Sequence, residues 1–161
     1  MSLHEHGFAV LPPDAQRWRA SNIMKIPNAD LLQDLGERDR LGGRLWRLPP
    51  FSASTWHRHL DSWELYFLLE GLGRMRVGDR TVSVPKYGCV LVAPPTLRQI
   101  FNDTPAASLW LVVAAPQERS HVSGADLSRF YPEDPRSLPP ELADRVWPPG
   151  QVAPKGGERP R

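Results

Sequence analysis

Two histidines and a glutamate stand close together in the middle of the chain: His57, His59 and Glu64. On an extended strand, residues two apart point to the same face, so the two imidazoles would lie side by side. Glu64 follows after the turn-like stretch 60–62, and the next strand can bring its carboxylate back beside both rings. Divalent Fe, Mn, Ni or Zn would accept two imidazoles and a carboxylate as ligands, with coordination positions left open. The spacing therefore predicts a transition-metal site.

A metal-free interpretation of the same residues stays open. Two histidines at this spacing also occur by chance, and they would then lie at the mouth of a barrel, hydrogen-bonded to their neighbours. The glutamate at this offset, followed by an apolar strand over 65–69 and a glycine at 71, favours the metal site.

The elements that must position these residues are short strands. Seven segments alternate polar and apolar residues or form short apolar runs, with turn residues between them. They cover 44–48, 63–69, 74–77, 81–84, 89–93, 97–101 and 109–115. This spacing predicts an all-β sandwich or barrel. Tyr66 shares the strand parity of Glu64 and is expected on the same face.

Proline marks the limits of this region. Only six of the 18 prolines fall within 41–115, and the rest lie in the flanks, where they oppose regular structure. We expect an irregular N-terminal arm over 1–40, a barrel over 41–116, and a Pro-rich C-terminal arm over 117–161 whose last residues are disordered. Asn28-Ala29-Asp30 predicts the cap of one short helix in the first arm.

The pattern His57-x-His59-x4-Glu64-x6-Gly71 resembles the first motif of the cupin superfamily. The resemblance covers about 41–115, just under half of the chain. It implies a single-domain cupin of the conserved-barrel type, an all-β double-stranded β-helix or jelly roll with irregular N- and C-terminal arms.

The second cupin motif is present in altered form between Gly88 and Asn102. Aligned on Asn102, Arg98 stands where the family has its last metal-binding histidine. Aligned on Gly88 and Pro94, Gln99 stands there instead. We favour Arg98, because the run Gln-Ile-Phe-Asn-Asp-Thr that follows it then fits the family better.

An arginine at this position changes the expected chemistry. A guanidinium has no lone pair to offer a metal and stays charged at physiological pH. Two outcomes are open. Either a three-ligand metal site survives and Arg98 holds an anionic substrate beside it, or Arg98 pairs with Glu64 and the pocket works without metal. The predicted substrate contacts are Arg98, Tyr66 and Gln99.

The resemblance implies a small-molecule protein but does not choose a reaction, because this fold hosts many functions. The leading interpretation is a metal-dependent enzyme of the oxygenase, isomerase or cyclase type that acts on a small anionic organic substrate. The rival is a non-catalytic binding or sensor module with a degenerate metal site. Neither interpretation assigns a catalytic residue.

Composition narrows the partners. A net charge of +2 is too small to indicate a nucleic-acid binder. The longest apolar run, 109–115, is too short to cross a membrane, and the start of the chain lacks a signal-peptide pattern, so we expect a cytoplasmic protein. An apolar, Trp-bearing outer sheet face predicts a homodimer. Cys89, beside a run of valine and leucine, is expected to be buried.

Overall fold

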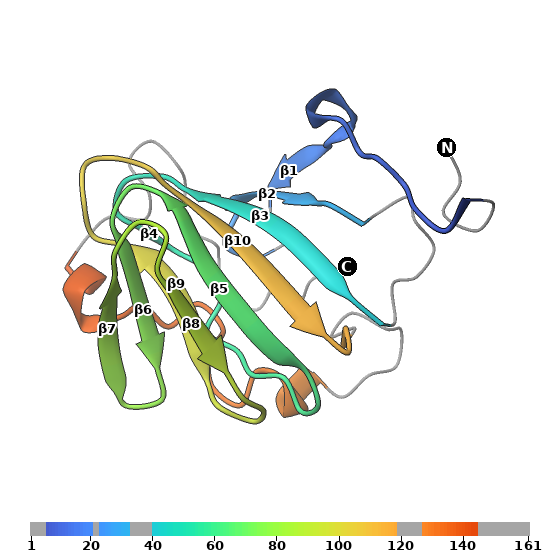
Figure 1. The fold of residues 1–161 in the computed structure, drawn as a ribbon. Coiled ribbons are helices and arrows are strands. Elements are labelled where there is room, and N and C mark those ends of the chain that lie inside the picture. Colours follow the sequence, from blue (N-terminus) through green and yellow to red (C-terminus); the bar gives the residue numbers. More distant parts are fainter. Residues whose placement is uncertain (1–5, 21–22, 33–39, 119–126, 145–161) are drawn as a thin grey trace.

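The computed structural model describes residues 6–20, 23–32, 40–118 and 127–144. Two antiparallel β-sheets pack face to face (Figure 1). The strands and 3-10 turns are η1 (Pro13–Ala15), β1 (Trp18–Ala20), β2 (Pro27–Asp30), β3 (Gly42–Leu48), β4 (Ser52–Ala53), β5 (Trp63–Glu70), β6 (Gly73–Val77), β7 (Arg80–Val84), β8 (Cys89–Val92), β9 (Arg98–Asn102), β10 (Ser108–Ala115), η2 (Leu127–Arg129) and η3 (Pro140–Leu142).

The larger sheet has the order β1-β2-β3-β10-β5-β8, and the smaller has the order β4-β9-β6-β7. The last strand, β10, therefore lies between β3 and β5, which are far from it in the sequence. This pairing closes the two sheets into the predicted all-β double-stranded arrangement. Each of the seven segments predicted as strands is a strand in the structure.

The N-terminal arm corrects one prediction. Asn28-Ala29-Asp30 does not cap a helix but forms most of β2, which pairs with β3 through Asn28↔Trp46 and Ala29↔Leu45. Asn28 and Ala29 are buried, so sheet pairing outweighs the capping preference of the asparagine. The Asp30 carboxylate accepts from the Leu32 amide and caps a turn instead. The remainder of the predicted helix, 33–36, lies outside the described residues.

The interior between the sheets is filled by large apolar side chains, among them Leu68, Met75 and Trp110, all fully buried. Two glycines of the β5–β6 turn allow this packing. At Gly73, a Cβ atom would lie 2.7 Å from the Trp110 ring. Gly71, the last residue of the first motif, has a φ of +81° and leaves no room for a Cβ beside the Ala107 carbonyl.

The C-terminal arm covers the outer face of the smaller sheet (Figure 1). Its backbone carbonyls at Pro135 and Ser137 accept hydrogen bonds from the Trp56 amide and the Gln99 side chain. Leu142 of η3 is buried in the same apolar cluster as Phe101 of β9. The smaller sheet is thus covered on both faces, and the arm is held against the segment that carries the two histidines.

Among the described residues, no helix has the length and apolar character needed to cross a bilayer.

Candidate metal and anion site

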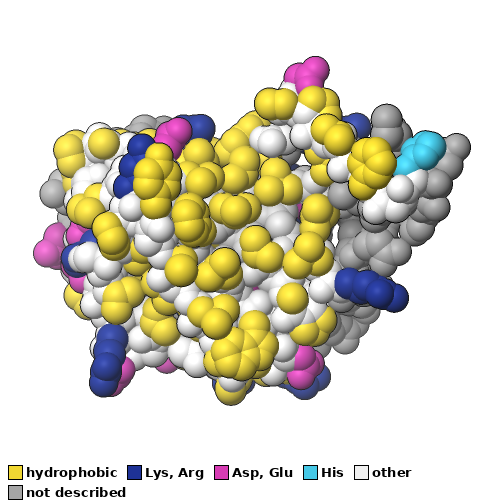
Figure 2. Space-filling model, viewed as in Figure 1, with side chains coloured by type: hydrophobic (Ala, Val, Ile, Leu, Met, Phe, Trp, Pro, Cys, Tyr) yellow, Lys and Arg dark blue, Asp and Glu magenta, His cyan; other side chains and the backbone are white. Residues whose placement is uncertain are grey.

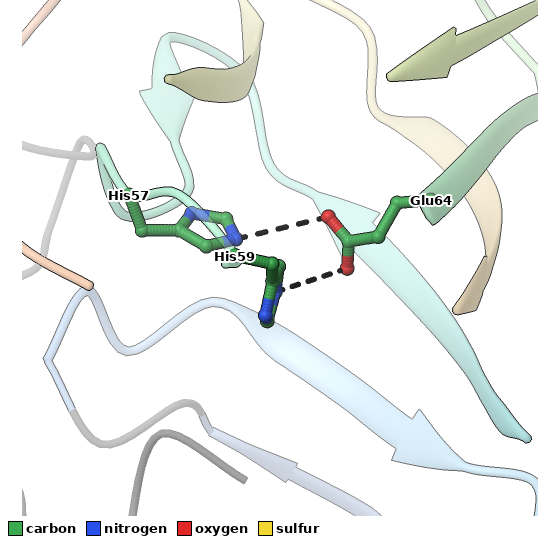
Figure 3. A group of neighbouring side chains, drawn as sticks. All are labelled: His57, His59 and Glu64. Atoms are coloured by element: carbon green, nitrogen blue, oxygen red, sulfur yellow. Dashed lines mark ion pairs between the residues drawn. The ribbon is translucent and has the colours of Figure 1, made fainter. Parts of the chain in front are cut away.

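His57 and His59 lie on an extended segment beside the smaller sheet, and Glu64 comes from β5 of the larger one (Figure 3). His57 forms an antiparallel bridge with Arg98, the first residue of β9. Its amide donates to the Arg98 carbonyl over 3.2 Å and its carbonyl accepts from the Arg98 amide over 2.8 Å. The site therefore joins the two sheets.

The three predicted ligands converge, with one donor atom from each within 4.8 Å of the others. The Glu64 carboxylate lies between the rings: Oε1 is 3.3 Å from His59 Nε2, and Oε2 is 4.0 Å from His57 Nε2 (Figure 3). The side chains of His57, His59 and Glu64 are 18%, 12% and 8% exposed. The parity argument from the sequence placed these residues correctly.

Arg98 completes the group. Its guanidinium is fully buried and its Nε lies 3.1 Å from Glu64 Oε2. The adjacent residue, Gln99, points the other way, as alternation along β9 requires. Its amide nitrogen donates to the carbonyls of Ser54 and Ser137. Of the two alignments of the second motif, the structure supports the one with Arg98 at the ligand position, and the prediction that Gln99 contacts a substrate is not supported.

Tyr66 lies on the same face of β5 as Glu64 and is buried. Its hydroxyl donates a 2.5 Å hydrogen bond to Glu64 Oε2. The same oxygen therefore faces both Tyr66 and Arg98, whereas Oε1 faces His59. Tyr66 belongs to the group as predicted, and it orients the carboxylate.

The protonation states follow from the surroundings. Burial, with a smaller contribution from the neighbouring His59, lowers the pKa of His57 to about 4. Burial would raise the pKa of Glu64, but the hydrogen bond and charge of His59, with smaller contributions from His57 and Arg98, outweigh it and bring the pKa to about 2. Burial and the Glu64 charge raise the pKa of Tyr66 well above its ordinary value. At neutral pH the group holds a neutral His57, a carboxylate and a phenol.

The donor set fits a metal ion. His57 Nδ1 lies 2.9 Å from the Thr55 carbonyl oxygen, which can only accept, so the neutral ring carries its proton on Nδ1. Its Nε2 lone pair then points toward another acceptor, the Glu64 carboxylate. Histidines that bind metals usually donate their second ring nitrogen to a carbonyl or carboxylate oxygen, as His57 does here. A cation between His57 Nε2 and the Glu64 carboxylate would complete that arrangement.

Sequence reasoning missed Glu118, which follows β10. Its Oε2 lies 3.4 Å from His59 Nδ1, and it accepts hydrogen bonds from the amides of Leu60 and Ser62. Burial tends to raise its pKa, but the backbone donors of residues 60–62 outweigh this effect and lower it. No sequence motif surrounds Glu118. Its position beside residues 60–62 follows only from the pairing of β10 with β5.

Two aromatic residues of the C-terminal arm also reach the site. Phe130 and Tyr131 lie with ring centroids 6.5 Å from those of His59 and His57. Trp56 is buried beneath the arm and donates to Glu133. Cys89, which the sequence predicted to be buried, is exposed on β8. The thiol is exposed because its register partner, Phe67, has the opposite parity to the buried Tyr66 and Leu68.

No protein-family model matches the sequence, and no curated protein matches it. Several solved structures are similar in fold. A predicted oxalate decarboxylase from Thermotoga maritima has a TM-score of 0.61 at 20% identity, covering 68% of this chain and all of that one. A sugar phosphate isomerase of the cupin superfamily from Silicibacter pomeroyi has a TM-score of 0.59 at 20% identity, covering 68% of this chain and 76% of that one. A cupin-2 domain from Rhodospirillum rubrum has a TM-score of 0.57 at 18% identity, covering 70% and 76%.

We predict that Glu64→Gln destabilises the fold more than Arg98→Met. Glu64 is the only ion-pair partner recorded for Arg98 among the described residues, so Glu64→Gln leaves a buried guanidinium uncompensated and should cost about 3 kcal/mol or more. After Arg98→Met, Glu64 keeps the Tyr66 hydroxyl and His59. Urea unfolding in the presence of a chelator would measure both losses. Equal losses, or a larger loss in Arg98→Met, would contradict the assigned pairing.

Proposed function

The chain has the fold of the cupin superfamily, and on this fold we propose that it is a metal-dependent cupin enzyme that acts on a small anionic organic molecule. His57, His59 and Glu64 would hold a divalent transition metal ion. Arg98 would receive the anionic group of the substrate. The solved structures of similar fold include proteins described as a predicted oxalate decarboxylase and a sugar phosphate isomerase, which supports a small-molecule role without choosing a reaction.

The proposal rests on the two Nε2 atoms and the Glu64 carboxylate, which face one another and could together bind a cation. The Nε2 atoms of His57 and His59 both point at Glu64, and the outer nitrogen of each ring lies beside an acceptor, the Thr55 carbonyl and the Glu118 carboxylate respectively. For His57, the pairing of Nδ1 with the Thr55 carbonyl leaves the Nε2 lone pair facing inward; His59 would offer its Nε2 lone pair in the same way when its proton is on Nδ1, beside Glu118. When bound, a divalent metal supplies Lewis-acid or redox chemistry at this point.

Charge at the site supports an anionic substrate. A divalent ion and Arg98 would bring three positive charges against the carboxylates of Glu64 and of Glu118, which lies behind His59, and this leaves one positive charge for a ligand to balance. By hydrogen-bond geometry, Nη1 and Nη2 of Arg98 are not paired among the described residues, although the side chain is fully buried and interacts with the neighbouring Tyr66 hydroxyl. Two parallel N–H groups of an arginine suit a carboxylate or phosphate group. Tyr66, held protonated by its surroundings, keeps Glu64 oriented while Arg98 orients the substrate.

A second function is favoured by one distance. The 3.1 Å separation between Arg98 Nε and Glu64 Oε2 is the contact expected if the carboxylate serves the arginine rather than a metal. In that case the protein is a non-catalytic binding or sensor module, and the imidazoles act as hydrogen-bonding groups.

Metal analysis separates the two functions. We expect protein purified without chelator or nickel resin to contain about one equivalent of Fe, Mn, Ni or Zn per chain, because the inward lone pairs favour a cation. His57→Ala and Glu64→Gln should each weaken binding at least about tenfold, or about 1.4 kcal/mol. His6→Ala is the control, since it removes an exposed imidazole from another part of the chain. A metal-free preparation that also fails to bind these ions on titration would leave the binding module as the function.

Arg98→His tests the ligand position itself. The variant removes a positive charge beside the metal and adds a fourth possible ligand, so we expect it to bind a divalent transition metal at least about tenfold more tightly than the parent, or about 1.4 kcal/mol. Arg98→Met is the matched control, because it removes the charge without adding a ligand and should gain less. Equal or weaker binding by Arg98→His would show that this position does not face the metal.

We further propose that the protein is a homodimer joined through the outer face of its larger sheet. Part of this face consists of three neighbouring rows of β3, β10, β5 and β8 that contain no charged residue, with Arg47 in the row that follows, and Figure 2 shows apolar side chains spread across the face. The rows consist of Leu45, Leu111, Phe67 and Cys89, then Gly43, Val113, Leu65 and Leu91, then Ala115 and Trp63. Exposure reaches 51% at Trp63 and 60% at Leu91. Isolated soluble proteins rarely keep apolar patches larger than a few hundred Å².

Light scattering at micromolar concentration should give twice the chain mass of 18.2 kDa. Leu91→Glu should shift the protein to the single-chain mass, because a buried, unpaired carboxylate at an apolar interface is unfavourable. Thr81→Glu adds the same charge on an exposed residue of the smaller sheet and should leave the dimer intact. A parent protein that scatters as a single chain would refute the dimer.

A further inference from the structure

Glu118 holds the loop that connects two of the three candidate ligands. Residues 60–62 join His59 to β5, where Glu64 lies. Glu118 Oε2 accepts from the amides of Leu60 at 2.7 Å and Ser62 at 3.2 Å. The Glu118 amide in turn donates to Ser62 Oγ over 3.0 Å, and that hydroxyl donates to the Pro116 carbonyl. The end of β10 is thus tied to this loop through both the backbone and the side chain of one residue.

The same carboxylate also faces His59. Glu118 Oε2 lies 3.4 Å from His59 Nδ1, and Glu64 Oε1 lies 3.3 Å from His59 Nε2. A neutral imidazole carries one proton and can donate to only one of these carboxylates. Both separations are ion-pair distances, and the buried Nδ1 makes no hydrogen bond in the structure, so Glu118 is a carboxylate beside a ring nitrogen that lacks a hydrogen-bond partner among the described residues. A ring that donates to Glu118 offers its Nε2 lone pair toward Glu64, which is the orientation that a metal requires.

We propose that Glu118 is a positioning residue of the metal site. It fixes the loop between His59 and Glu64, and by accepting the Nδ1 proton it turns the Nε2 lone pair of His59 toward the metal position. Its role in metal binding rests on the proposed function. Its effect on the His59 proton does not, and it can be observed in metal-free protein.

The first measurement is the position of the proton on each histidine ring in chelator-treated protein, from long-range ¹H–¹⁵N correlations, which distinguish a ring protonated at Nδ1, at Nε2 or at both. In Glu118→Ala, the His59 proton should move toward Nε2, because Glu64 is then the remaining carboxylate acceptor. His57 is an internal reference, since its Nδ1 faces the Thr55 carbonyl and should not change. Glu118→Gln, whose amide oxygen can still accept, should lie between Glu118→Ala and the parent.

The second measurement is metal affinity, titrated with Zn²⁺ alone. Removing an acceptor behind a histidine ligand weakens binding about 10- to 100-fold, and we expect this from Glu118→Ala. Glu133→Ala is the matched control: Glu133 also belongs to the C-terminal arm and accepts from Trp56 beside His57, and among the described residues it forms no hydrogen bond or ion pair with either histidine ring. It should change the affinity by less than about threefold, well below the range expected for Glu118→Ala.

The outcomes separate the two proposals. An unchanged His59 tautomer in Glu118→Ala overturns the role of Glu118, whatever the metal result. If the tautomer shifts but the protein binds no metal, the contact between Glu118 and His59 is supported and the proposed metal site is refuted. If Glu118→Ala and Glu133→Ala weaken metal binding equally, the loss comes from loosening the C-terminal arm in general. Glu118 would then have no particular role at the site.

Discussion

The arrangement of this site depends on a charge that cannot reach water. The Arg98 guanidinium is fully buried between the two sheets, and a buried, unpaired charge costs several kcal/mol. Glu64 is the counter-charge, at 3.1 Å. The carboxylate is in turn held by Tyr66 through its Oε2, which leaves Oε1 toward His59. The geometry of the candidate metal ligands thus follows from the need to neutralise one arginine.

The same residue links this charge to the architecture. Arg98 and His57 exchange both backbone hydrogen bonds, so the segment that carries the imidazoles is aligned by β9, while Glu64 is carried by β5 of the opposite sheet. The C-terminal arm closes the segment from outside, through the Trp56 amide to Pro135 and the Arg58 amide to Phe130. The histidines are therefore held between a strand of the smaller sheet and an arm whose described residues contain two short 3-10 turns, η2 and η3.

Strand parity explains how much of this could be predicted. Alternation along a strand places Tyr66 with Glu64 and separates Arg98 from Gln99, and it requires only the local sequence. Long-range pairing cannot be obtained in this way. β2 was predicted as a helix cap, because Asn28 has the preference of a capping residue and only its pairing with Trp46 of β3 shows otherwise. Glu118 was missed for the same reason: its partners lie 56 to 58 residues away along the chain.

Arg98 stands where the second cupin motif has a metal-binding histidine, so a possible ligand is replaced by a positive charge. This replacement couples the binding of a metal to the binding of an anion. Without a metal, Glu64 and Arg98 cancel and the Glu118 carboxylate leaves the site with one negative charge, which does not attract an anion. With a divalent ion the same groups would carry one positive charge, so an anion and the metal would each favour the binding of the other. Such coupling is reciprocal, and a factor gained by one ligand is gained by the other. A histidine in place of Arg98 would bind the metal more tightly but would leave less charge for the substrate. The arginine therefore suits a site in which the anion helps to retain the metal.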